Sequence, residues 1–210
     1  MRYIVLLNYE RNSDGLLYQV NKEKYNYDIN YVKNSYDVLG ELNTRMAHLR
    51  LGYIVGSLGF VPKSIIDVGY GNGAFLKTCT SLIEKCYGFD VTDYPLPENV
   101  EFASDWKTKS VDVITFFDVL EHFDDPYMIK DLKASYISLS FPWCNYKSDA
   151  WFESWKHRKP NEHLWFFDEK SIYKFAETTG YTVINHSNIE DTIRKSTDSP
   201  NILSVVLRKN

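Results

Sequence analysis

The chain has 210 residues, of which 44% are hydrophobic, 25% charged and 16% aromatic. A soluble chain of this length buries roughly 70% of its unfolded surface, which favours one domain with a substantial core. The high aromatic content excludes a disordered chain. Because 24 Lys and Arg face 28 Asp and Glu, the net charge is −4, which argues against broad electrostatic binding to nucleic acid or acidic membranes.

The N-terminal region, residues 1–36, is predicted to be an extension of the main domain. Residues 2–7 and 16–20 have the composition of strands, and the turn signal at residues 12–15 between them predicts a β-hairpin. From residue 37 to about residue 58, apolar side chains recur at helical spacing. The main domain is therefore expected to begin with a helix.

Strands and helices alternate through the middle of the chain. We expect strands at 65–68, 86–91, 100–103, 111–117, 136–141, 181–185 and 202–207, and helices at 75–86 and 170–179. This alternation predicts a Rossmann-like α/β domain, a doubly wound and mostly parallel sheet with helices on both faces. Since no helix separates the last two strands, they should form an antiparallel pair at one edge.

The cysteines and the apolar runs indicate where such a chain resides. Cys79, Cys86 and Cys144 form no Cys-x-x-Cys pair, and an odd number cannot close a disulfide framework. The apolar runs at residues 4–7 and 50–61 are too short to cross a bilayer. We therefore expect a soluble, cytoplasmic protein.

A glycine-rich turn joins the first predicted strand of the sheet to the helix after it. Gly69, Gly71 and Gly73 permit a tight turn and a close approach of backbone to ligand, with the N–H groups of the helix facing that ligand. In open parallel sheets, ligands bind beyond the carboxyl ends of the strands. The turn therefore predicts a ligand at that edge.

Acidic residues follow four successive strands at this edge. Asp67 ends the first strand, and Asp90 ends the second, 21 residues after Gly69. A carboxylate in that second position can hold a ribose diol. Asp105 and Asp118 follow the third and fourth strands. Together with the glycine turn, they predict a nucleotide-like ligand.

Several stretches resemble class I S-adenosylmethionine-dependent methyltransferases. They are residues 65–73, 87–90 and 116–126, together with the later 163–167, and the resemblance extends over about residues 40–208. The Leu-Glu-His-x-x-Asp-Pro pattern after the fourth strand is the most specific of these. The similarity is greatest to the branch that modifies sugars, quinones and other metabolites.

The resemblance implies S-adenosylmethionine as cofactor, S-adenosylhomocysteine as product, and a role for each matching residue. Six residues are implied to lie under the methionine part and beside its charged groups: Gly69, Gly71, Gly73, Asp67, Phe117 and Asp118. Asp90 would hold the ribose hydroxyls, Asp105 would accept from the adenine amine, and Trp106 and Phe89 would lie against the base. Arg45 is a candidate partner for the methionine carboxylate, although a solvated helix charge is an equally open interpretation. No metal site is predicted.

The glycine pattern also leaves a second cofactor open. Gly69-x-Gly71-x-x-Ala74 formally fits a dinucleotide fingerprint, so NAD is the rival ligand. The acid before the turn and the Asp105-Trp106 pair argue against it. Tyr70 departs from the family, which usually has a small residue or Cys there.

A proton acceptor near the methyl group is the remaining chemical requirement when the acceptor is a hydroxyl. His122 is the first candidate, because it follows the fourth strand and titrates near neutral pH; a purely structural role in the turn is the alternative. His163 is the second candidate and His157 a weaker third. Asp118 and Glu121 could serve if burial raised their pKa.

Residues 143–167 fit neither strand nor helix and contain four tryptophans and two histidines. We interpret them as an insertion on the acceptor side of a methyltransferase domain at 37–210, and the alternative is a satellite core. The basic run at 156–159 could meet a phosphate of the acceptor, or be a solvated loop.

The sequence thus predicts methyl transfer to a hydroxyl or amine of a small molecule, a sugar or another metabolite. Nucleic acid is an unlikely partner on charge, and no membrane partner is expected. Two alternatives stay open: a methyltransferase of nucleic acid or protein, and a methyltransferase-like binding subunit without turnover. The second is suggested by Tyr70, which departs from the family at the glycine turn.

Overall fold

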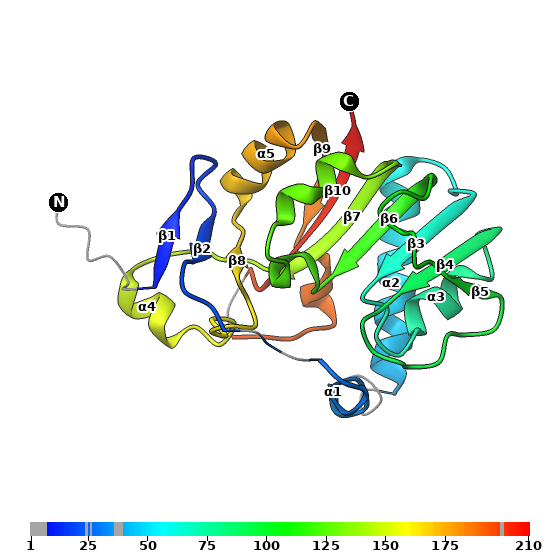
Figure 1. Ribbon diagram of the computed structural model, residues 1–210, viewed down its shortest axis with the longest axis horizontal. Coiled ribbons are helices and arrows are strands. Elements are labelled where there is room, and N and C mark those ends of the chain that lie inside the picture. The colour runs from blue at the N-terminus through cyan, green and yellow to red at the C-terminus, as the bar shows by residue number, and fades with distance from the viewer. Residues whose placement is uncertain (1–7, 24, 26, 36–39, 198–199) are drawn as a thin grey trace.

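The computed structural model describes residues 8–23, 25, 27–35, 40–197 and 200–210. A seven-stranded sheet with the strand order β5-β4-β3-β6-β7-β10-β9 forms its centre (Figure 1). Its strands are β3 (Ser64–Val68), β4 (Lys85–Phe89), β5 (Val100–Phe102), β6 (Val111–Phe117), β7 (Ala134–Pro142), β9 (Tyr181–Ser187) and β10 (Ile202–Lys209).

The strand directions confirm the predicted α/β class. Strands β3 to β7 pair in parallel. Strand β10 lies between β7 and β9 and runs antiparallel to both. The expected antiparallel pair of C-terminal strands is therefore present. The later strand, β10, lies inside the sheet, and the earlier strand, β9, forms its edge.

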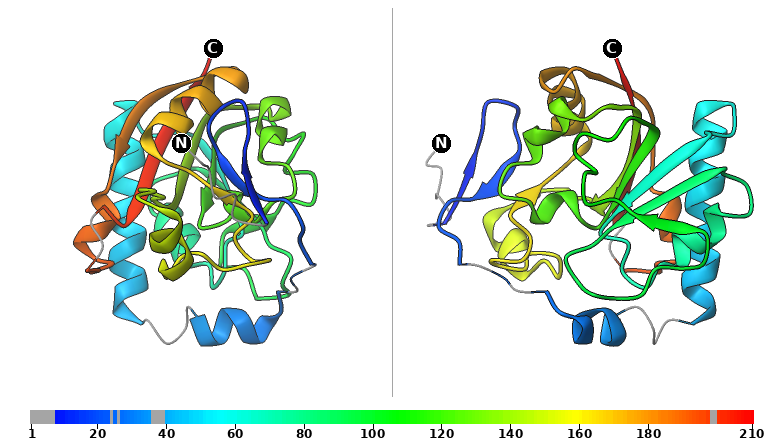
Figure 2. Two further views of the ribbon diagram at one scale, coloured as in Figure 1. Left: turned by 90° about the vertical axis from the view of Figure 1, so that its left-hand side faces the viewer. Right: turned by 45° about the vertical axis from the view of Figure 1, so that its right-hand side comes forward.

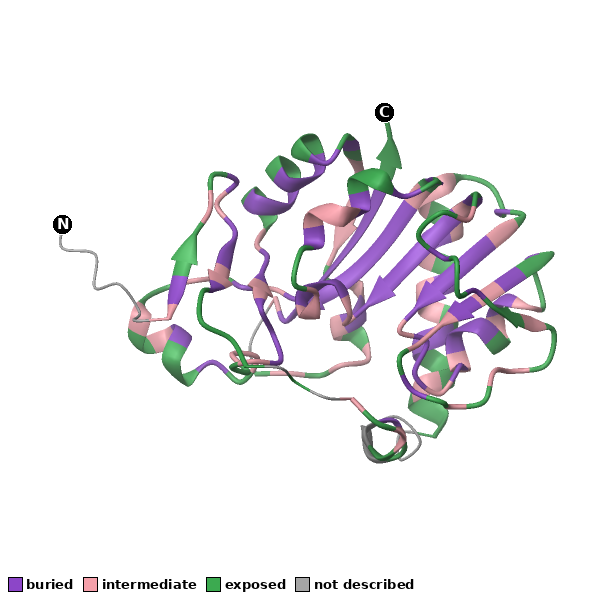
Figure 3. Ribbon diagram, in the orientation of Figure 1, coloured by how far each residue is buried: buried purple, intermediate pink, exposed green. Residues whose placement is uncertain are grey.

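Helices cover both faces of this sheet (Figure 2). The helical segments of the domain are α2 (Glu41–Leu58), α3 (Ala74–Cys79), η2 (Leu120–His122), η3 (Pro126–Asp131), α5 (Glu169–Thr178) and η4 (Ile189–Thr192). Side chains of α2 and α3 share one hydrophobic cluster, and those of η3 and α5 share another. Neighbouring strand residues alternate between the clusters, Ile65 facing α2 and Ile66 facing α5. The central strands are consequently buried along most of their length (Figure 3).

Two elements differ from the sequence-based expectation. The helix expected at 75–86 ends at Cys79, because the chain turns there, and the Ile83 N–H still reaches the Cys79 carbonyl at 2.8 Å. Apolar residues beyond Cys79 thus fill the core from a turn, while Leu82 is 51% exposed. Helix α2 begins at Glu41, and the expected start at 37 lies outside the described residues.

The N-terminal hairpin is present, with its first strand later than expected. Strand β1 (Tyr9–Arg11) pairs antiparallel with β2 (Leu17–Gln19). The Asn12 side chain accepts hydrogen bonds from two backbone N–H groups of the turn, at 3.1 and 3.0 Å. The expected strand at 2–7 lies outside the described residues.

This hairpin is completed by the tryptophan-rich segment. Strand β8 (Trp165–Phe166) pairs with β2, and α4 (Asp149–Ser154) packs beside the resulting three-stranded sheet. Tyr9, Phe152 and Trp155 meet in a small separate core. The short helix α1 (Ile29–Ser35) then leads from this sheet to α2. In the part of the chain that the structure describes, none of the helices has the length and apolar character needed to cross a membrane.

Candidate active site

Two cavities meet at the carboxyl ends of the parallel strands. The larger has a volume of about 470 Å³ and the smaller about 240 Å³. Gly69, Gly71, Asp118 and His122 line both of them. The arrangement places the glycine turn and the segment after β6 between two adjoining spaces, at the edge of the sheet where the sequence predicts a ligand.

The glycine turn is shaped by close backbone contacts. Gly69 has a φ of 75°, and a Cβ there would overlap the Val119 side chain. Its N–H donates to the Phe89 carbonyl at 2.6 Å. Gly73 precedes α3 with a φ of 74°, and a Cβ there would lie 2.7 Å from Pro97. Gly73 lines neither cavity, so its role is to permit the turn into α3.

Asp90 lies at the end of β4 and lines the smaller cavity with Phe89 and Val91. One carboxylate oxygen accepts from the Gly71 N–H at 2.9 Å, and the other accepts from the Thr92 N–H at 2.8 Å. These bonds fix the carboxylate and tie it to the glycine turn. The oxygen that faces Thr92 also accepts from the Thr92 hydroxyl at 2.9 Å, so the oxygen bonded to Gly71 is the one that keeps a lone pair for a ligand.

The structure does not place the Asp105–Trp106 pair in either cavity. The Asp105 side chain is 57% exposed and lies 3.6 Å from the Lys109 ammonium group. Trp106 is buried in the core beside Phe116 and Phe123. The aromatic ring that faces the smaller cavity from β4 is Phe89 instead.

Asp67 is a buried acid at the end of β3 that lines the larger cavity. The Thr115 hydroxyl donates to it at 2.6 Å. Burial raises the pKa of Asp67 to about 7, against the lowering effects of the Thr115 hydrogen bond and the Arg50 charge. The carboxyl group is therefore poised to gain or lose a proton near neutral pH.

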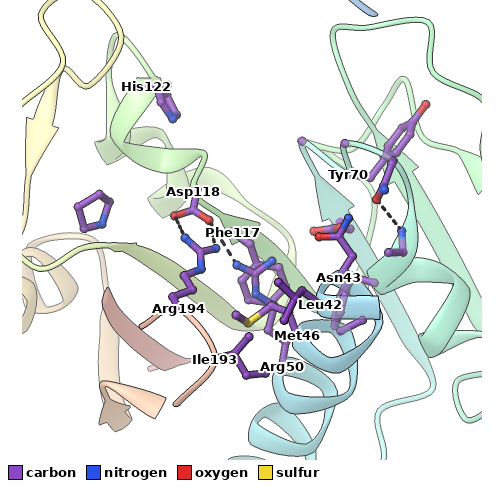
Figure 4. A pocket seen from close by; sticks show the side chains of 18 of the residues that line it. Leu42, Asn43, Met46, Arg50, Tyr70, Phe117, Asp118, His122, Ile193 and Arg194 are labelled. Atoms are coloured by element: carbon purple, nitrogen blue, oxygen red, sulfur yellow. Dashed lines mark hydrogen bonds and ion pairs between the residues drawn. The ribbon is translucent and has the colours of Figure 1, made fainter. Parts of the chain in front are cut away.

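Asp118 lies between two arginines (Figure 4). Its φ is 56°, and it forms ion pairs with Arg194 and, at 3.3 Å, with Arg50. Glu190 closes the cluster, 2.8 Å from Arg50 and 3.0 Å from Arg194. Burial alone would raise the pKa of Asp118, but the two guanidinium groups outweigh it and hold that pKa well below its usual range.

Arg50, not Arg45, is the α2 arginine in the cavity. Arg45 is exposed and lines neither cavity. Arg50 stands one turn after the buried Met46 on the inner face of α2, and its guanidinium group lies 4.2 Å from the centre of the Phe117 ring. The helical spacing of the buried positions would have identified Arg50. Arg194 and Glu190 had no such signal, because they come from the segment between β9 and β10.

Glu121, His122 and His163 form a second cluster at this edge. His122 Nδ1 lies 2.6 Å from the Glu162 carbonyl oxygen, and His163 Nδ1 lies 2.8 Å from the His157 carbonyl oxygen. Burial lowers the pKa of His122, and it lowers that of His163 to about 3. Burial and the nearby Asp118 charge raise the pKa of Glu121. Both imidazoles are therefore neutral at pH 7.

The insertion contributes histidines, not tryptophans, to the larger cavity. His157, Lys159 and His163 line it. Trp151 stacks on Trp155 in the satellite core, and none of the tryptophans of the segment lines either cavity. The basic run at 156–159 is divided among separate contacts, including a Lys159–Glu162 ion pair of 3.0 Å. The satellite-core interpretation therefore fits Trp151 and Trp155, whereas Trp143 and Trp165 pack against the main core.

Tyr70 turns away from the Asp118 cluster (Figure 4). Its hydroxyl donates to the Tyr94 carbonyl, and its ring packs in the cluster between the sheet and α3. The smaller cavity is closed from the N-terminal side by Tyr27 and Val32. The Tyr27 hydroxyl lies 2.9 Å from His122 Nδ1. Tyr70 thus packs in the core and also lines the larger cavity, and the extension reaches the site through Tyr27.

Comparison with known proteins follows this geometry. A family model described as a methyltransferase domain matches residues 41–186. A search of curated protein sequences finds no match.

Solved structures share the fold at low sequence identity. Burkholderia thailandensis 1,6-didemethyltoxoflavin-N1-methyltransferase, with bound 1,6-didemethyltoxoflavin and S-adenosylhomocysteine, is 13% identical with a TM-score of 0.64, over 97% of this chain and 99% of that one. Magnesium protoporphyrin IX methyltransferase from Synechocystis PCC 6803, with S-adenosylhomocysteine, is 14% identical with a TM-score of 0.58, over 86% and 96%. A Haloferax volcanii methyltransferase in complex with the Trm112 activator is 13% identical with a TM-score of 0.55, over 83% and 97%.

Proposed function

Because the chain belongs to the methyltransferase-domain family, whose model matches residues 41–186, we propose that it transfers a methyl group from S-adenosylmethionine to a hydroxyl or amine of a small molecule. The observation that carries this proposal is the pair of adjoining cavities that share Gly69, Gly71, Asp118 and His122. One space is suited to the nucleoside and the other to the acceptor. They meet where the methionine part would lie.

The residues of the smaller cavity fit an adenosine. Gly69 lacks the Cβ that would collide with Val119, so its backbone can face the ligand directly. Backbone N–H groups hold the Asp90 carboxylate in place, and its Gly71-bound oxygen can accept from a ribose hydroxyl. Phe89 and Val91 offer apolar surface to the base, with Tyr27 and Val32 over the opening. A single nucleoside is sufficient to explain this lining, which weighs against NAD.

On the other side of the glycine turn, Asp67 is proposed to face the amino group of the methionine part. S-adenosylmethionine supplies a methyl group that its sulfonium charge has already activated. The chain must therefore align the acceptor and accept a proton from it. His122 and His163 are the proposed proton-accepting groups, because each Nδ1 is engaged by a carbonyl and each Nε2 keeps its lone pair. Of the two, His122 is the stronger candidate, because burial lowers the pKa of His163 to about 3 and so weakens it as a base.

A small acceptor suits the larger cavity. Its lining comes from α2, the glycine turn, the segment after β6 and the insertion, so it is bounded on several sides. Its cations Arg50, Arg194 and Lys159 are all paired with acids, which leaves no basic track for a nucleic acid. The packing of Tyr70 in the core cluster supports an active enzyme over an inactive binding subunit, although Tyr70 also lines the larger cavity.

The same proposal assigns parts of the chain. Residues 37–210 form the methyltransferase domain, with 143–167 as an insertion that contributes to the acceptor side. Residues 1–36 form an extension. Tyr27 and Val32 of that extension line the smaller cavity, which supports a role in covering the cofactor.

Calorimetric titration with S-adenosylhomocysteine tests the proposal. We expect micromolar binding by the wild-type chain and a loss of about 2–4 kcal/mol, roughly 30- to 1000-fold in Kd, in Asp90→Ala, which removes charge-assisted hydrogen bonds to the ribose. Asp93→Ala, an exposed acid of the next loop, is the matched control and should bind like wild type. Undetectable binding by the wild type would refute the cofactor assignment.

A further inference from the structure

Glu121, His122 and His163 bring three potential metal ligands together on the acceptor side of the site. One carboxylate oxygen of Glu121 and one ring nitrogen of each histidine all lie within 4.8 Å of one another. The Glu121 Oε1 to His122 Nε2 distance is 3.8 Å. Ligands of one zinc ion are about 3–3.5 Å apart when each metal–ligand bond is about 2.1 Å. Binding a cation would therefore bring the most distant ligand atoms up to about 1.3 Å closer together.

The backbone holds these residues together from two distant segments. Glu121 and His122 belong to η2, whereas His163 follows a turn of the insertion. The Leu164 N–H donates to the Glu121 carbonyl at 2.8 Å. The insertion is thus fastened to η2 beside the cluster, which gives the three side chains a defined mutual position.

The hydrogen bonds of the two imidazoles determine which nitrogen is available. A carbonyl oxygen only accepts, so the Nδ1 atoms that face the Glu162 and His157 carbonyls, at 2.6 and 2.8 Å, carry the ring protons. Each Nε2 then has a free lone pair. Metal-bound histidines usually have this arrangement, in which a carbonyl or carboxylate orients the ring through its other nitrogen.

The surroundings of Glu121 are suited to a metal ligand. Its side chain is 1% exposed, and neither carboxylate oxygen has a hydrogen-bond partner among the described residues. A buried carboxylate is costly unless something compensates it. Arg194 and Lys159 offset this cost only in part, because their own ion pairs are with Asp118 and Glu162.

We propose that Glu121, His122 and His163 bind a divalent first-row transition-metal ion. Two imidazole nitrogens and one carboxylate oxygen favour ions such as zinc, manganese or iron over calcium and magnesium, which prefer oxygen ligands. Three protein ligands leave coordination positions open. Because His122 and His163 line the larger cavity, these positions face the space assigned to the acceptor.

The ion would give the site a substrate preference, an inference that rests on the proposed methyl-transfer function. A hydroxyl bound to a divalent cation loses its proton more readily than in water. The acceptors favoured by such a site carry an oxygen donor next to, or at, the position that is methylated. With the ion bound, His122 and His163 act as ligands in place of proton acceptors, the ion lowers the pKa of the acceptor hydroxyl, and the proton is released to solvent.

Zinc titration of chelator-treated protein tests the metal site. We expect one equivalent of Zn²⁺ to bind to the wild type by calorimetry, and binding at least about tenfold weaker in Glu121→Gln and in His163→Gln. His48→Gln removes an exposed histidine of α2 and should bind zinc like the wild type. Equal zinc binding by all four proteins, or none by the wild type, would overturn the site.

Cobalt and S-adenosylhomocysteine provide the second readout. Co²⁺ bound to nitrogen and oxygen should show weak visible bands; an intense thiolate charge-transfer band would place the ion at Cys79, Cys86 or Cys144 and overturn the proposal. Binding of S-adenosylhomocysteine by Glu121→Gln shows that this variant folds. A wild type that binds S-adenosylhomocysteine but no metal refutes the metal site only, whereas one that binds zinc but not S-adenosylhomocysteine supports the site and refutes the cofactor assignment.

Discussion

Asp118 and Glu121 are acids three residues apart with opposite surroundings. Asp118 forms ion pairs with Arg50 and Arg194, and its side chain is 22% exposed. Glu121 is 1% exposed and has no hydrogen-bond partner for its carboxylate among the described residues. Both follow the same strand, so the local sequence does not explain the difference.

The difference lies in what distant segments bring to each acid. Arg50 comes from α2, and Arg194 follows η4, so two separate parts of the chain neutralise Asp118. The insertion brings His163 to Glu121, a neutral base in place of a cation. A buried charge that the fold has paired is structural, and one that the fold leaves unpaired marks a place for a ligand.

Breaking the paired acid should have the largest effect. Asp118→Asn leaves two arginines with one carboxylate, and we expect it to lower the free energy of unfolding by about 2–4 kcal/mol, discounted for the partial exposure of the cluster. Asn tolerates the positive φ of this position, so backbone strain is not introduced. Urea unfolding measures the change. A loss below about 1 kcal/mol would mean that the ion pairs contribute little.

Asp67 is a third acid between these extremes, because its hydrogen-bond donor is the neutral Thr115 hydroxyl. With its pKa raised by burial to about 7, the carboxyl group is mostly protonated at pH 6 and mostly ionised at pH 8. An ionised Asp67 attracts the ligand amino group. The affinity for S-adenosylhomocysteine should therefore rise about tenfold from pH 6 to pH 8.

Calorimetry at both pH values checks this expectation. Asp67→Asn cannot ionise and should show the same affinity at pH 6 and pH 8. If the wild type also lacked a pH dependence, Asp67 would not face the amino group.

Neutralising the unpaired acid should change stability little. In metal-free protein, Glu121→Gln keeps the shape of the side chain and removes no hydrogen bond of its carboxylate, so the free energy of unfolding should change by less than about 1 kcal/mol. Urea unfolding in the presence of a chelator measures it, beside Asp118→Asn. A loss as large as that of Asp118→Asn would show that Glu121 has a structural partner.

The smallest effect is expected for a substitution of Arg45, and a larger one for a substitution of Arg50, the other arginine of α2. Arg45→Ala should change stability by no more than about 0.5 kcal/mol and leave the affinity for S-adenosylhomocysteine unchanged, because Arg45 is exposed and lines neither cavity. Arg50→Ala breaks the pairing of Glu190 and should cost several times more. Equal effects of the two substitutions would contradict the assignment of Arg50 to the cluster.

Local sequence was sufficient for the sheet and for the edge at which the site lies. The apolar runs at 65–68 and 111–117 became β3 and β6, because strands buried on both faces need continuous apolar sequence. The glycine turn and Asp90 came together because the carboxyl ends of parallel strands share one edge, and the Gly71 N–H to Asp90 hydrogen bond joins them.

Tertiary structure alone decided which charges were paired. The sequence offered Arg45 as a candidate and placed Trp106 at the ligand, whereas the helix face of α2 and the packing of the core against Phe116 determine the outcome. Ion pairs such as Arg194–Asp118 join residues 76 positions apart, and no local pattern specifies such a contact. Spacing fixes where a side chain leaves the backbone, but its partners depend on how distant segments pack.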